Sequence, residues 1–318
     1  LSNTGTAAVL IPVVIGIAAS SDFSRGKLLM PLVFAAALGG NLSIIGAPGN
    51  LIGTNALNEL GIETGFFEYI GVGLPMLVFG ILYFAVFGYK LLPDNKNLVS
   101  ADDDQFAAKD FSGVPVWKQT ASLVILILSI LAMIFEKRIG VKLHVSASVG
   151  AIILILTGVI SEKEALRSID LKTVFLFGGS LALASALETT GAGTLVADAI
   201  IHALGDTPSP FLLLLVIWIV TCALTNFMSN TATTALMVPI AVALAQGVGA
   251  DPRAVVVATV IAGSCAYATP IGMPANTMVV GIGGYSFRDY VKAGLPLIGV
   301  SFVICMVLLP ILFPFFPG

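Results

Sequence analysis

The segment Thr225-Asn226-Phe227-Met228-Ser229-Asn230-Thr231-Ala232-Thr233-Thr234 is a polar island between two long apolar runs, and a second copy of residues 229–235 stands near the start of the chain. That copy, Ser2-Asn3-Thr4-Gly5-Thr6-Ala7-Ala8, begins 227 residues earlier, and Pro12 then matches Pro239 at the same separation. Chance explains one such match in apolar sequence but not four in the same order, so we infer an internal duplication. The two remaining matches are Gly46-Ala47-Pro48-Gly49-Asn50 with Gly272-Met273-Pro274-Ala275-Asn276, and Glu68-Tyr69 with Asp289-Tyr290.

The composition indicates a membrane protein with several spans. Hydrophobic residues make up 57% of the 318 residues and charged residues 10%, and the mean hydropathy is +1.02. This leaves too little polar surface for a soluble protein of this length. Nearly all charge falls in short loops, so no nucleic-acid partner is expected. The cysteines lie in apolar runs, which favours buried thiols over a disulfide or a metal site; they are Cys222, Cys265 and Cys305.

The apolar runs predict an all-α polytopic membrane protein. A membrane-spanning helix needs about 20 mostly apolar residues, and several runs reach or approach that length. They are residues 71–91, 117–135, 143–160, 171–187 and 295–315.

Other apolar runs are interrupted by polar sequence. Residues 5–19 and 210–225 are short arms bounded by a polar island, and residues 232–247 leave the second island. Residues 28–39 and 254–266 run into loops of Gly, Pro and Asn, and apolar sequence resumes near Leu51 and Thr277. Unwound backbone at membrane depth is stable only where it is buried in protein or lines a cavity. Each repeat is therefore expected to contain one re-entrant hairpin and one broken transmembrane helix, as in secondary transporters.

The charges predict how the chain is oriented. Residues 1–92 form the later part of a first repeat, residues 93–116 a cytoplasmic linker, and residues 117–318 a second repeat. With the linker inside, eleven of the fifteen Lys and Arg residues are inside and four outside, which agrees with the positive-inside rule. The C-terminus is then outside the plasma (inner) membrane, and the two polar tips enter from opposite faces, so the repeats are predicted to be inverted. Because the chain starts at Leu1 within the first island, an N-terminal part of the native protein is expected to precede it.

The polar islands are predicted to bind an anion. A helix that begins at membrane depth, as after Asn3 and Asn230, presents unpaired N–H groups and about half a positive charge. Hydroxyl groups beside these helix ends would add directional hydrogen bonds to a carboxylate or sulfate, and they belong to Ser2, Thr4, Ser229 and Thr231.

The same loops are also suited to a small hard cation, which needs several oxygen ligands. The candidates are Asn3, Ser43, Gly46 and Asn50 in one half, and Thr225, Asn230, Gly272 and Asn276 in the other. No Asp or Glu occurs in these loops, which argues against a proton or cation antiporter. The alternative is that Ser, Thr and Asn only join membrane helices through hydrogen bonds. The duplication of both the tips and the breaks favours a binding site.

With these motifs laid out, the chain resembles the divalent anion/sodium symporter family of the ion transporter superfamily. Its signature is matched by residues 229–235, and Leu176-Phe177-Gly178-Gly179-Ser180 and Val280-Gly281-Ile282-Gly283-Gly284-Tyr285 are similar to family segments. Many members have Thr-Pro-Pro-Asn in the broken helices, whereas this chain has Ala47-Pro48-Gly49-Asn50 and Met273-Pro274-Ala275-Asn276. Since a hydroxyl is lost twice, these departures bear on the choice of anion.

The resemblance implies roles for matching residues. The tips would contact the substrate together with Pro48 and Pro274. One sodium ion would lie between Asn3 and the loop near Gly46. A second would lie between the other tip and its loop, held by Thr225, Met228, Asn230, Gly272 and Met273. The resemblance also implies a homodimer and an elevator motion.

We therefore expect a sodium-coupled symporter of small divalent anions, with C4-dicarboxylates ahead of sulfate or citrate. The partners are the anion and the lipid bilayer, and no organic cofactor is expected. The alternatives are an arsenite permease or sodium/proton antiporter of the same superfamily, an anion channel, and a structural membrane protein. An enzyme is not expected, because the sequence contains no nucleophile–base pair and no cluster of metal ligands.

Overall fold

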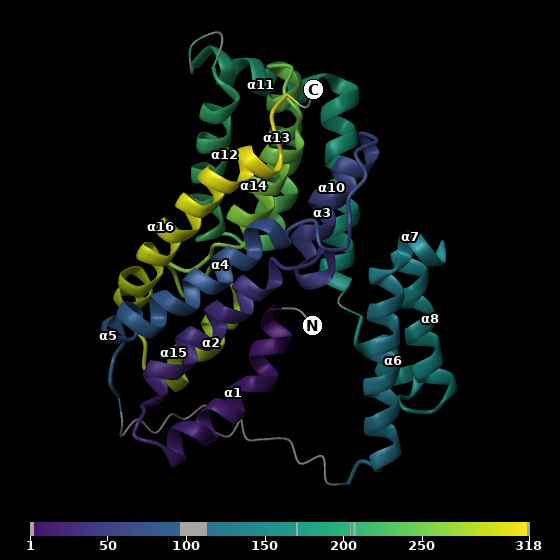
Figure 1. The fold of residues 1–318 in the computed structure, drawn as a ribbon, viewed down its shortest axis with the longest axis vertical. Helices are drawn as coiled ribbons and strands as arrows, with labels where there is room; N and C mark the ends of the chain where they lie inside the picture. Colours follow the sequence, from purple (N-terminus) through teal and green to yellow (C-terminus); the bar gives the residue numbers. More distant parts are fainter. Residues whose placement is uncertain (1–2, 96–112, 170, 204, 206–207, 317–318) are drawn as a thin grey trace. The chain divides into compact units, whose positions relative to one another are not determined.

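The computed structural model describes residues 3–95, 113–169, 171–203, 205 and 208–316, and within these ranges the regular structure is entirely helical (Figure 1). The chain forms two compact units, one of Leu1–Ala107 with Phe175–Gly318 and the other of Ala108–Val174. The helices are α1 (Asn3–Ser20), α2 (Arg25–Gly40), η1 (Ile44–Gly46), α3 (Pro48–Glu59), α4 (Ile70–Tyr83), η2 (Phe84–Gly88), α5 (Tyr89–Leu91), α6 (Val116–Ile134), α7 (Glu136–Ile139), α8 (Leu143–Leu156), α9 (Glu162–Arg167), α10 (Leu171–Thr190), α11 (Ala192–Ala203), α12 (Pro210–Thr225), α13 (Asn230–Gly247), α14 (Arg253–Gly263), α15 (Pro274–Gly283) and α16 (Phe287–Leu312).

In the first part of the larger unit, α1 packs on α2, and a short loop with one 3-10 turn joins α2 to α3. α1 contains Pro12 and changes direction part-way along its length (Figure 1), because proline removes a backbone hydrogen bond inside a helix. α4 passes through the single π-helical turn η2 into α5, so Ile70–Leu91 is one continuous apolar span.

In the second part, α12 and α13 form a helical hairpin that turns over residues 226–229. α12 begins at Pro210 after the N-cap Ser209, and α13 begins after the N-cap Ser229, whose hydroxyl accepts a hydrogen bond from the N–H of Ala232. α14 packs against both arms, and a ten-residue loop, residues 264–273, leads to α15.

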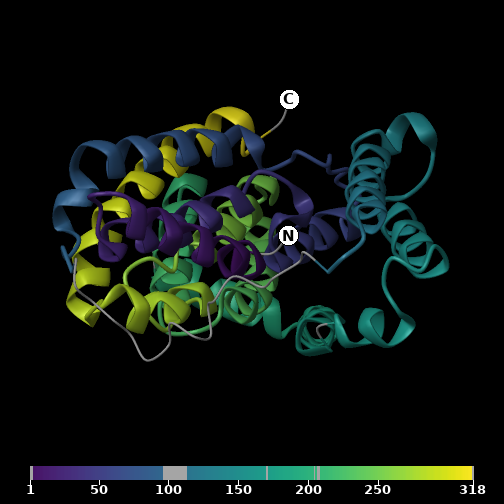
Figure 2. The ribbon, with the colours of Figure 1, turned by 90° about the horizontal axis from the view of Figure 1, so that it is seen from below.

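The two parts pack together within this unit. α16 lies beside α4, α15 beside α2, and α13 beside α3 (Figures 1 and 2). The Tyr83 hydroxyl donates to the carbonyl of Ala293 at 2.8 Å, and the Tyr285 hydroxyl donates to the carbonyl of Gly26 at 2.8 Å. The core of this unit therefore contains helices from both copies of the duplicated sequence.

The smaller unit is built around α6 and α8, which pack against each other. Gly150 of α8 lies so close to Ser129 of α6 that a side chain at Gly150 would collide with the serine. Ser161 and Glu164 cap α9 reciprocally, and the hydrogen bonds from Ser161 lower the pKa of the Glu164 carboxyl.

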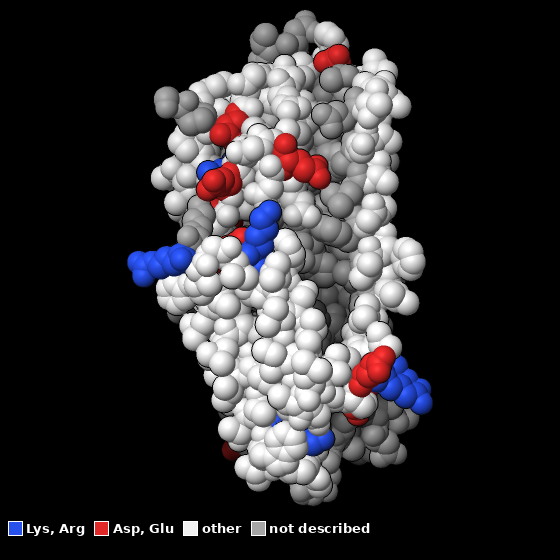
Figure 3. Space-filling view, turned by 90° about the vertical axis from the view of Figure 1, so that its right-hand side faces the viewer, with Lys and Arg blue, Asp and Glu red and all other residues white. Residues whose placement is uncertain are grey.

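The helices agree with a protein of several membrane spans. Four helical segments are long and apolar enough to cross a bilayer: Asn3–Ser20, Ile70–Leu91, Val116–Ile134 and Phe287–Leu312. Charged side chains are few on the face in Figure 3, and broad uncharged areas separate them. Cys222, Cys265 and Cys305 are free and buried, as the sequence predicts.

Helices lie over all five predicted apolar runs, but in the described residues only those at 71–91, 117–135 and 295–315 are long and apolar enough to cross a bilayer, and α8 is too short. α1, predicted as a short hairpin arm over residues 5–19, is long enough to cross. α16 begins at Phe287, eight residues before the predicted run, because Ser286 and Asp289 form a capping box there. α8 ends at Leu156 rather than Ile160, and α11 falls where no helix was predicted. Most of the predicted linker, residues 93–116, lies outside the described residues.

Candidate functional site

The side-chain amides of Asn50 and Asn276 close the two duplicated loops in the same way. Asn50 Nδ2 donates to the carbonyls of Gly40 and Ser43 at 2.8 and 2.7 Å. Asn276 Nδ2 donates to the carbonyls of Ala266 and Thr269 at 2.7 and 2.9 Å. Each amide reaches ten and seven residues back along the chain and satisfies two carbonyls that a helix break leaves open. The duplication is therefore present in hydrogen bonds as well as in sequence.

Two buried tyrosines support these asparagines from outside the loops. The Tyr69 hydroxyl donates to the carbonyl of Asn50 at 2.8 Å, and the Tyr290 hydroxyl donates to the carbonyl of Asn276 at 2.7 Å. Both tyrosines are fully buried. Sequence reasoning used them only as markers of the duplication and gave them no role. Their place beside a matched acidic residue was the available signal.

Two glycines at matched positions allow the following helices to approach the loops. A side chain at Gly73 would collide with the carbonyl of Asn41, and one at Gly294 would collide with the carbonyl of Tyr267. The helices α4 and α16 thus touch the loop backbone directly, and only glycine permits this contact.

The second tip, which is the turn between α12 and α13, brings together four oxygen-bearing groups. The Thr225 hydroxyl donates to the carbonyl of Gly263 at 2.6 Å. One end of the Asn230 amide lies 2.9 Å from Thr225 Oγ1, 3.2 Å from the carbonyl oxygen of Gly263 and 3.3 Å from that of Gly272. The three surrounding oxygens favour Nδ2 at this end, whose two hydrogens are shared among them. When a cation occupies the group, Oδ1 can turn to this end and add a fourth oxygen. The second arrangement is one that a small hard cation binds.

Gly272 holds its loop against this tip. A Cβ at Gly272 would lie 2.7 Å from the carbonyl oxygen of Thr225 and 3.1 Å from the Cα of Asn226. Asn226 adds to the junction: its Nδ2 donates to the carbonyl of Cys222 at 2.7 Å, and its Oδ1 accepts from the N–H of Ala268 at 2.9 Å. Sequence reasoning assigned no role to Asn226, although it belongs to the polar island.

The first tip is arranged around Gly40. Asn3 lies so close to Gly40 that a side chain there would meet its Oδ1, and Gly46 lies against the carbonyl of Gly40. That carbonyl also accepts from Asn50, so Asn3, Gly46 and Asn50 are neighbours, and Ser43 contributes its carbonyl to the same loop. Ser2 lies outside the described residues.

Several oxygen atoms at these two loops are buried without a hydrogen-bond partner among the residues that the structure describes. They include the Oδ1 atoms of Asn3, Asn41, Asn50 and Asn276 and the hydroxyl oxygen of Tyr267. An unpaired buried oxygen is costly, and native sites of this kind usually have a ligand, an ion or water. The set of neutral oxygens fits a sodium ion.

The predicted anion contacts lie at helix N-termini. α1, α3, α13 and α15 begin at Asn3, Pro48, Asn230 and Pro274, so four positive helix ends belong to the two islands. Ser229 and Thr231 are partly exposed, as are Thr4 and Pro48, while Pro274 is exposed. Met228 is 37% exposed and Met273 is buried.

A separate cavity of about 530 Å³ lies between α12 and α16. Its walls include Trp218, Leu295 and Phe302, and Asn226 and Thr269 are among its few polar residues. An apolar wall does not suit a doubly charged anion, so this cavity is distinct from the predicted anion site.

The family described as citrate transporter matches residues 1–262. The chain belongs to this family. The resemblance to the divalent anion/sodium symporters is also confirmed, since the citrate transporter family match is joined by sodium-dependent dicarboxylate transporters among the relatives. The family consists of transporters, and the chain is accordingly an integral membrane protein.

Three relatives are similar to this protein over most of the chain. An uncharacterized transporter of Haemophilus influenzae is 30% identical over 92% of this chain and 65% of its own length. The sodium-dependent dicarboxylate transporter SdcS of Staphylococcus saprophyticus is 24% identical over 98% of this chain and 66% of its own length. SdcS of Staphylococcus aureus strain USA300 is 27% identical over 92% of this chain and 62% of its own length. The chain spans about two thirds or less of the length of these relatives.

Proposed function

We propose that the chain is the binding part of a sodium-coupled symporter for small divalent anions, with C4-dicarboxylates as the first substrate class. The observation that supports this most directly is the group of oxygens around Asn230, which includes the Thr225 hydroxyl and the carbonyls of Gly263 and Gly272. Neutral oxygens at a helix break suit a sodium ion without requiring a carboxylate. The SdcS relatives are sodium-dependent dicarboxylate transporters, which supports the same proposal.

Sodium is a co-substrate in this proposal. The second site takes its ligands from the tip and the loop beside it, and the first site from the corresponding residues of the other half. The ligands are Thr225, Met228, Asn230, Gly272, Met273 and Asn276 at one site, and Asn3, Ser43, Gly46 and Asn50 at the other. The buried Oδ1 atoms of the three asparagines Asn3, Asn50 and Asn276, which lack a partner within the described part of the chain, supply oxygens of the required kind.

The anion is proposed to bind where the tips meet the N-terminal ends of the broken helices. Half a unit of positive helix charge acting on a doubly charged anion about 4 Å away is worth about 4 kcal/mol at an effective dielectric of about 20, before desolvation. The contacts are Ser2, Asn3, Thr4, Ser229, Asn230 and Thr231, with Pro48 and Pro274. Bound sodium would add positive charge beside these ends, which explains why the anion would depend on it.

The architecture follows as part of the proposal. Residues 1–92 and 117–318 are parts of inverted repeats joined by the linker 93–116, the C-terminus is outside, and the protein works as a homodimer by an elevator motion. The matched hydrogen bonds of Asn50 and Asn276 support the duplication on which this depends.

A binding experiment tests the proposal. The unfolding temperature of the purified chain is measured in sodium chloride and in choline chloride, with succinate, citrate, sulfate and arsenite titrated in each. A bound ligand at a hundred times its Kd stabilises the folded state by about 2.7 kcal/mol. Succinate is expected to raise the unfolding temperature only in sodium. A response to citrate or sulfate alone would move the substrate to that anion, and no response to sodium would refute coupling.

A further inference from the structure

Thr234 connects the second tip with the first half of the chain. Its hydroxyl donates to the carbonyl of Asn230 one turn earlier in α13, at 2.9 Å, and its side chain is buried. A Cβ placed on Gly49, the second residue of α3, would lie 2.9 Å from Thr234 Oγ1 and 3.3 Å from Thr234 Cβ. The threonine therefore fills the space that a side chain at Gly49 would need.

The same side chain also fills the space of a second glycine. A side chain at Gly263, the last residue of α14, would collide with Thr234 Oγ1. The carbonyl of Gly263 is one of the oxygens grouped around Asn230. Thr234 is thus packed between Gly263, whose carbonyl belongs to the proposed cation site, and the N-terminus of α3, where Asn50 closes the first duplicated loop.

The matched positions of the duplication show how this contact is built. The threonine corresponds to Ala7, and the two glycines Gly49 and Gly263 correspond to Ala275 and Ala37. All three alanines are fully buried. The set around Thr234 therefore has one larger and two small residues where the matched set has three alanines, and each set takes residues from both halves. Such an exchange of size among matched positions indicates two packed sets of three residues, each spanning the two halves.

We propose that Thr234 is a positioning residue that couples the cation-binding oxygens of the second half to the N-terminus of α3 in the first half. This inference rests on the proposed function, because it concerns sodium binding at the second tip. Thr234 touches neither the ion nor the anion. It fixes the turn that carries Asn230 and the distance between that turn and α3.

Substitutions can separate packing from coupling. Thr234→Ala leaves a space between the two glycines, and Gly49→Ala/Thr234→Ala fills that space with the pair found at Ala275 and Ala7. Thr234→Ser keeps the hydroxyl. Thr259→Ala is the matched control, because Thr259 is a buried threonine of α14 whose hydroxyl also donates to the carbonyl four residues earlier, at 2.7 Å.

For each chain, the unfolding temperature is measured in choline chloride, and sodium is then titrated at saturating succinate to find the concentration that gives half of the stabilisation. Thr234→Ala is expected to lower the unfolding temperature and to raise this sodium concentration about fivefold or more. The double variant is expected to recover the unfolding temperature of the unsubstituted chain. Its sodium concentration at half stabilisation is expected to lie within about twofold of that of the unsubstituted chain. Thr234→Ser is expected to stay near the unsubstituted chain, and Thr259→Ala to lose stability without a change in sodium dependence.

The outcomes distinguish the two hypotheses. If the double variant loses as much stability as Gly49→Ala and Thr234→Ala added together, the packing of these residues as one set would be overturned. A sodium midpoint that stays unchanged in Thr234→Ala would overturn the coupling role while leaving the proposed function intact. A lack of sodium response in the unsubstituted chain would overturn the proposed function, and the role of Thr234 with it.

Discussion

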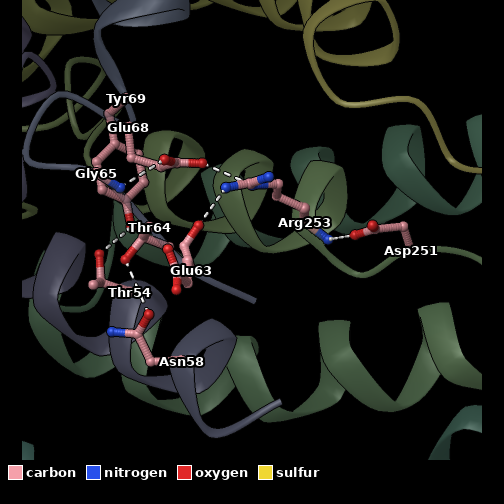
Figure 4. Close-up of polar contacts among 9 residues, drawn as sticks. All are labelled: Thr54, Asn58, Glu63, Thr64, Gly65, Glu68, Tyr69, Asp251 and Arg253. Carbon is pink, nitrogen blue, oxygen red and sulfur yellow. Dashed lines mark hydrogen bonds and ion pairs between the residues drawn. The ribbon is translucent and has the colours of Figure 1, made fainter. Parts of the chain in front are cut away.

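Arg253 and Glu68, 185 residues apart in the chain, form an ion pair in which Arg253 Nε lies 2.8 Å from Glu68 Oε1 (Figure 4). Glu68 Oε2 accepts from the N–H of Gly65 at 3.0 Å, and Arg253 Nη2 donates to the carbonyl of Glu63 at 2.7 Å. The pair therefore joins the loop before α4 to the start of α14. It also places a negative charge beside the N-terminal end of α14, where the helix dipole favours it.

Separate loss of either charge is expected to cost stability. Glu68 is 9% exposed and Arg253 is 30% exposed, so the pair is shielded from water more than a surface pair. Glu68→Gln and Arg253→Gln are each expected to lower the free energy of unfolding by about 1–2 kcal/mol. The double variant is expected to lose less than their sum, and the measurement is a chemical-denaturation double-mutant cycle. Strictly additive losses would show that the pair contributes no coupling.

Removal of either loop-closing side chain, that of Asn50 or of Asn276, is expected to have nearly the same effect on stability and on the response to sodium. Asn50→Ala and Asn276→Ala each leave two buried carbonyls without a donor, at about 1–3 kcal/mol for each carbonyl. Both variants are expected to unfold several degrees earlier and to lose sodium-dependent stabilisation. The control is Asn58→Ala, because the Asn58 side chain is exposed and its amide oxygen accepts a hydrogen bond from the Thr64 hydroxyl. A normal sodium response in Asn50→Ala or Asn276→Ala would contradict the assignment of that loop.

Asn230 is expected to act through its amide oxygen. Asn230→Ala is predicted to abolish sodium-dependent stabilisation while the chain stays folded and inserted, because it removes a ligand rather than packing. Asn230→Asp keeps an oxygen at this position but loses the donor, so a retained sodium response is expected. Sodium titration by thermal unfolding checks both. If Asn230→Asp behaves like Asn230→Ala, the donor to Gly263 and Gly272 is the group that matters.

Gly272 is expected to tolerate no side chain. Its Cβ would meet the backbone of Thr225 at 2.7 Å and that of Asn226 at 3.1 Å, and backbone atoms cannot rotate away. Gly272→Ala is therefore expected to cost about 1–3 kcal/mol and to abolish sodium binding. Gly16→Ala is the control, because within the described part of the chain a Cβ at that position in α1 would meet open space rather than another element. A Gly272→Ala chain with unchanged stability and sodium response would refute the contact.

The helices of the hairpin could be predicted closely because their ends have strong local signals. α12 occupies the predicted residues 210–225, where Pro210 marks its start and the polar island its end. α16 was predicted too short because Arg288, Asp289 and Lys292 interrupt the hydropathy, although the capping box begins the helix before them. α11 was missed because it combines apolar residues with Gly, Thr, Asp and His.

The contacts that shape the site could not be read from the sequence. Tyr69 and Tyr290 reach asparagine carbonyls 19 and 14 residues earlier in the chain, and no periodic pattern encodes a contact across a loop of that length. The contact of Thr234 with Gly49 depends on how α13 packs on α3, which is a tertiary feature. The polar islands themselves were visible because they break apolar sequence and occur twice.

The burial of all three cysteines makes the natural chain a convenient starting point for spectroscopy. Cys222, Cys265 and Cys305 are free and buried, so water-soluble maleimide and spin-label reagents are expected to leave them largely unreacted. Single cysteines introduced on exposed loops can then be labelled against a quiet background without first removing the native thiols. Distances between two such labels, with and without sodium, would test whether the hairpin moves as the proposed elevator motion requires.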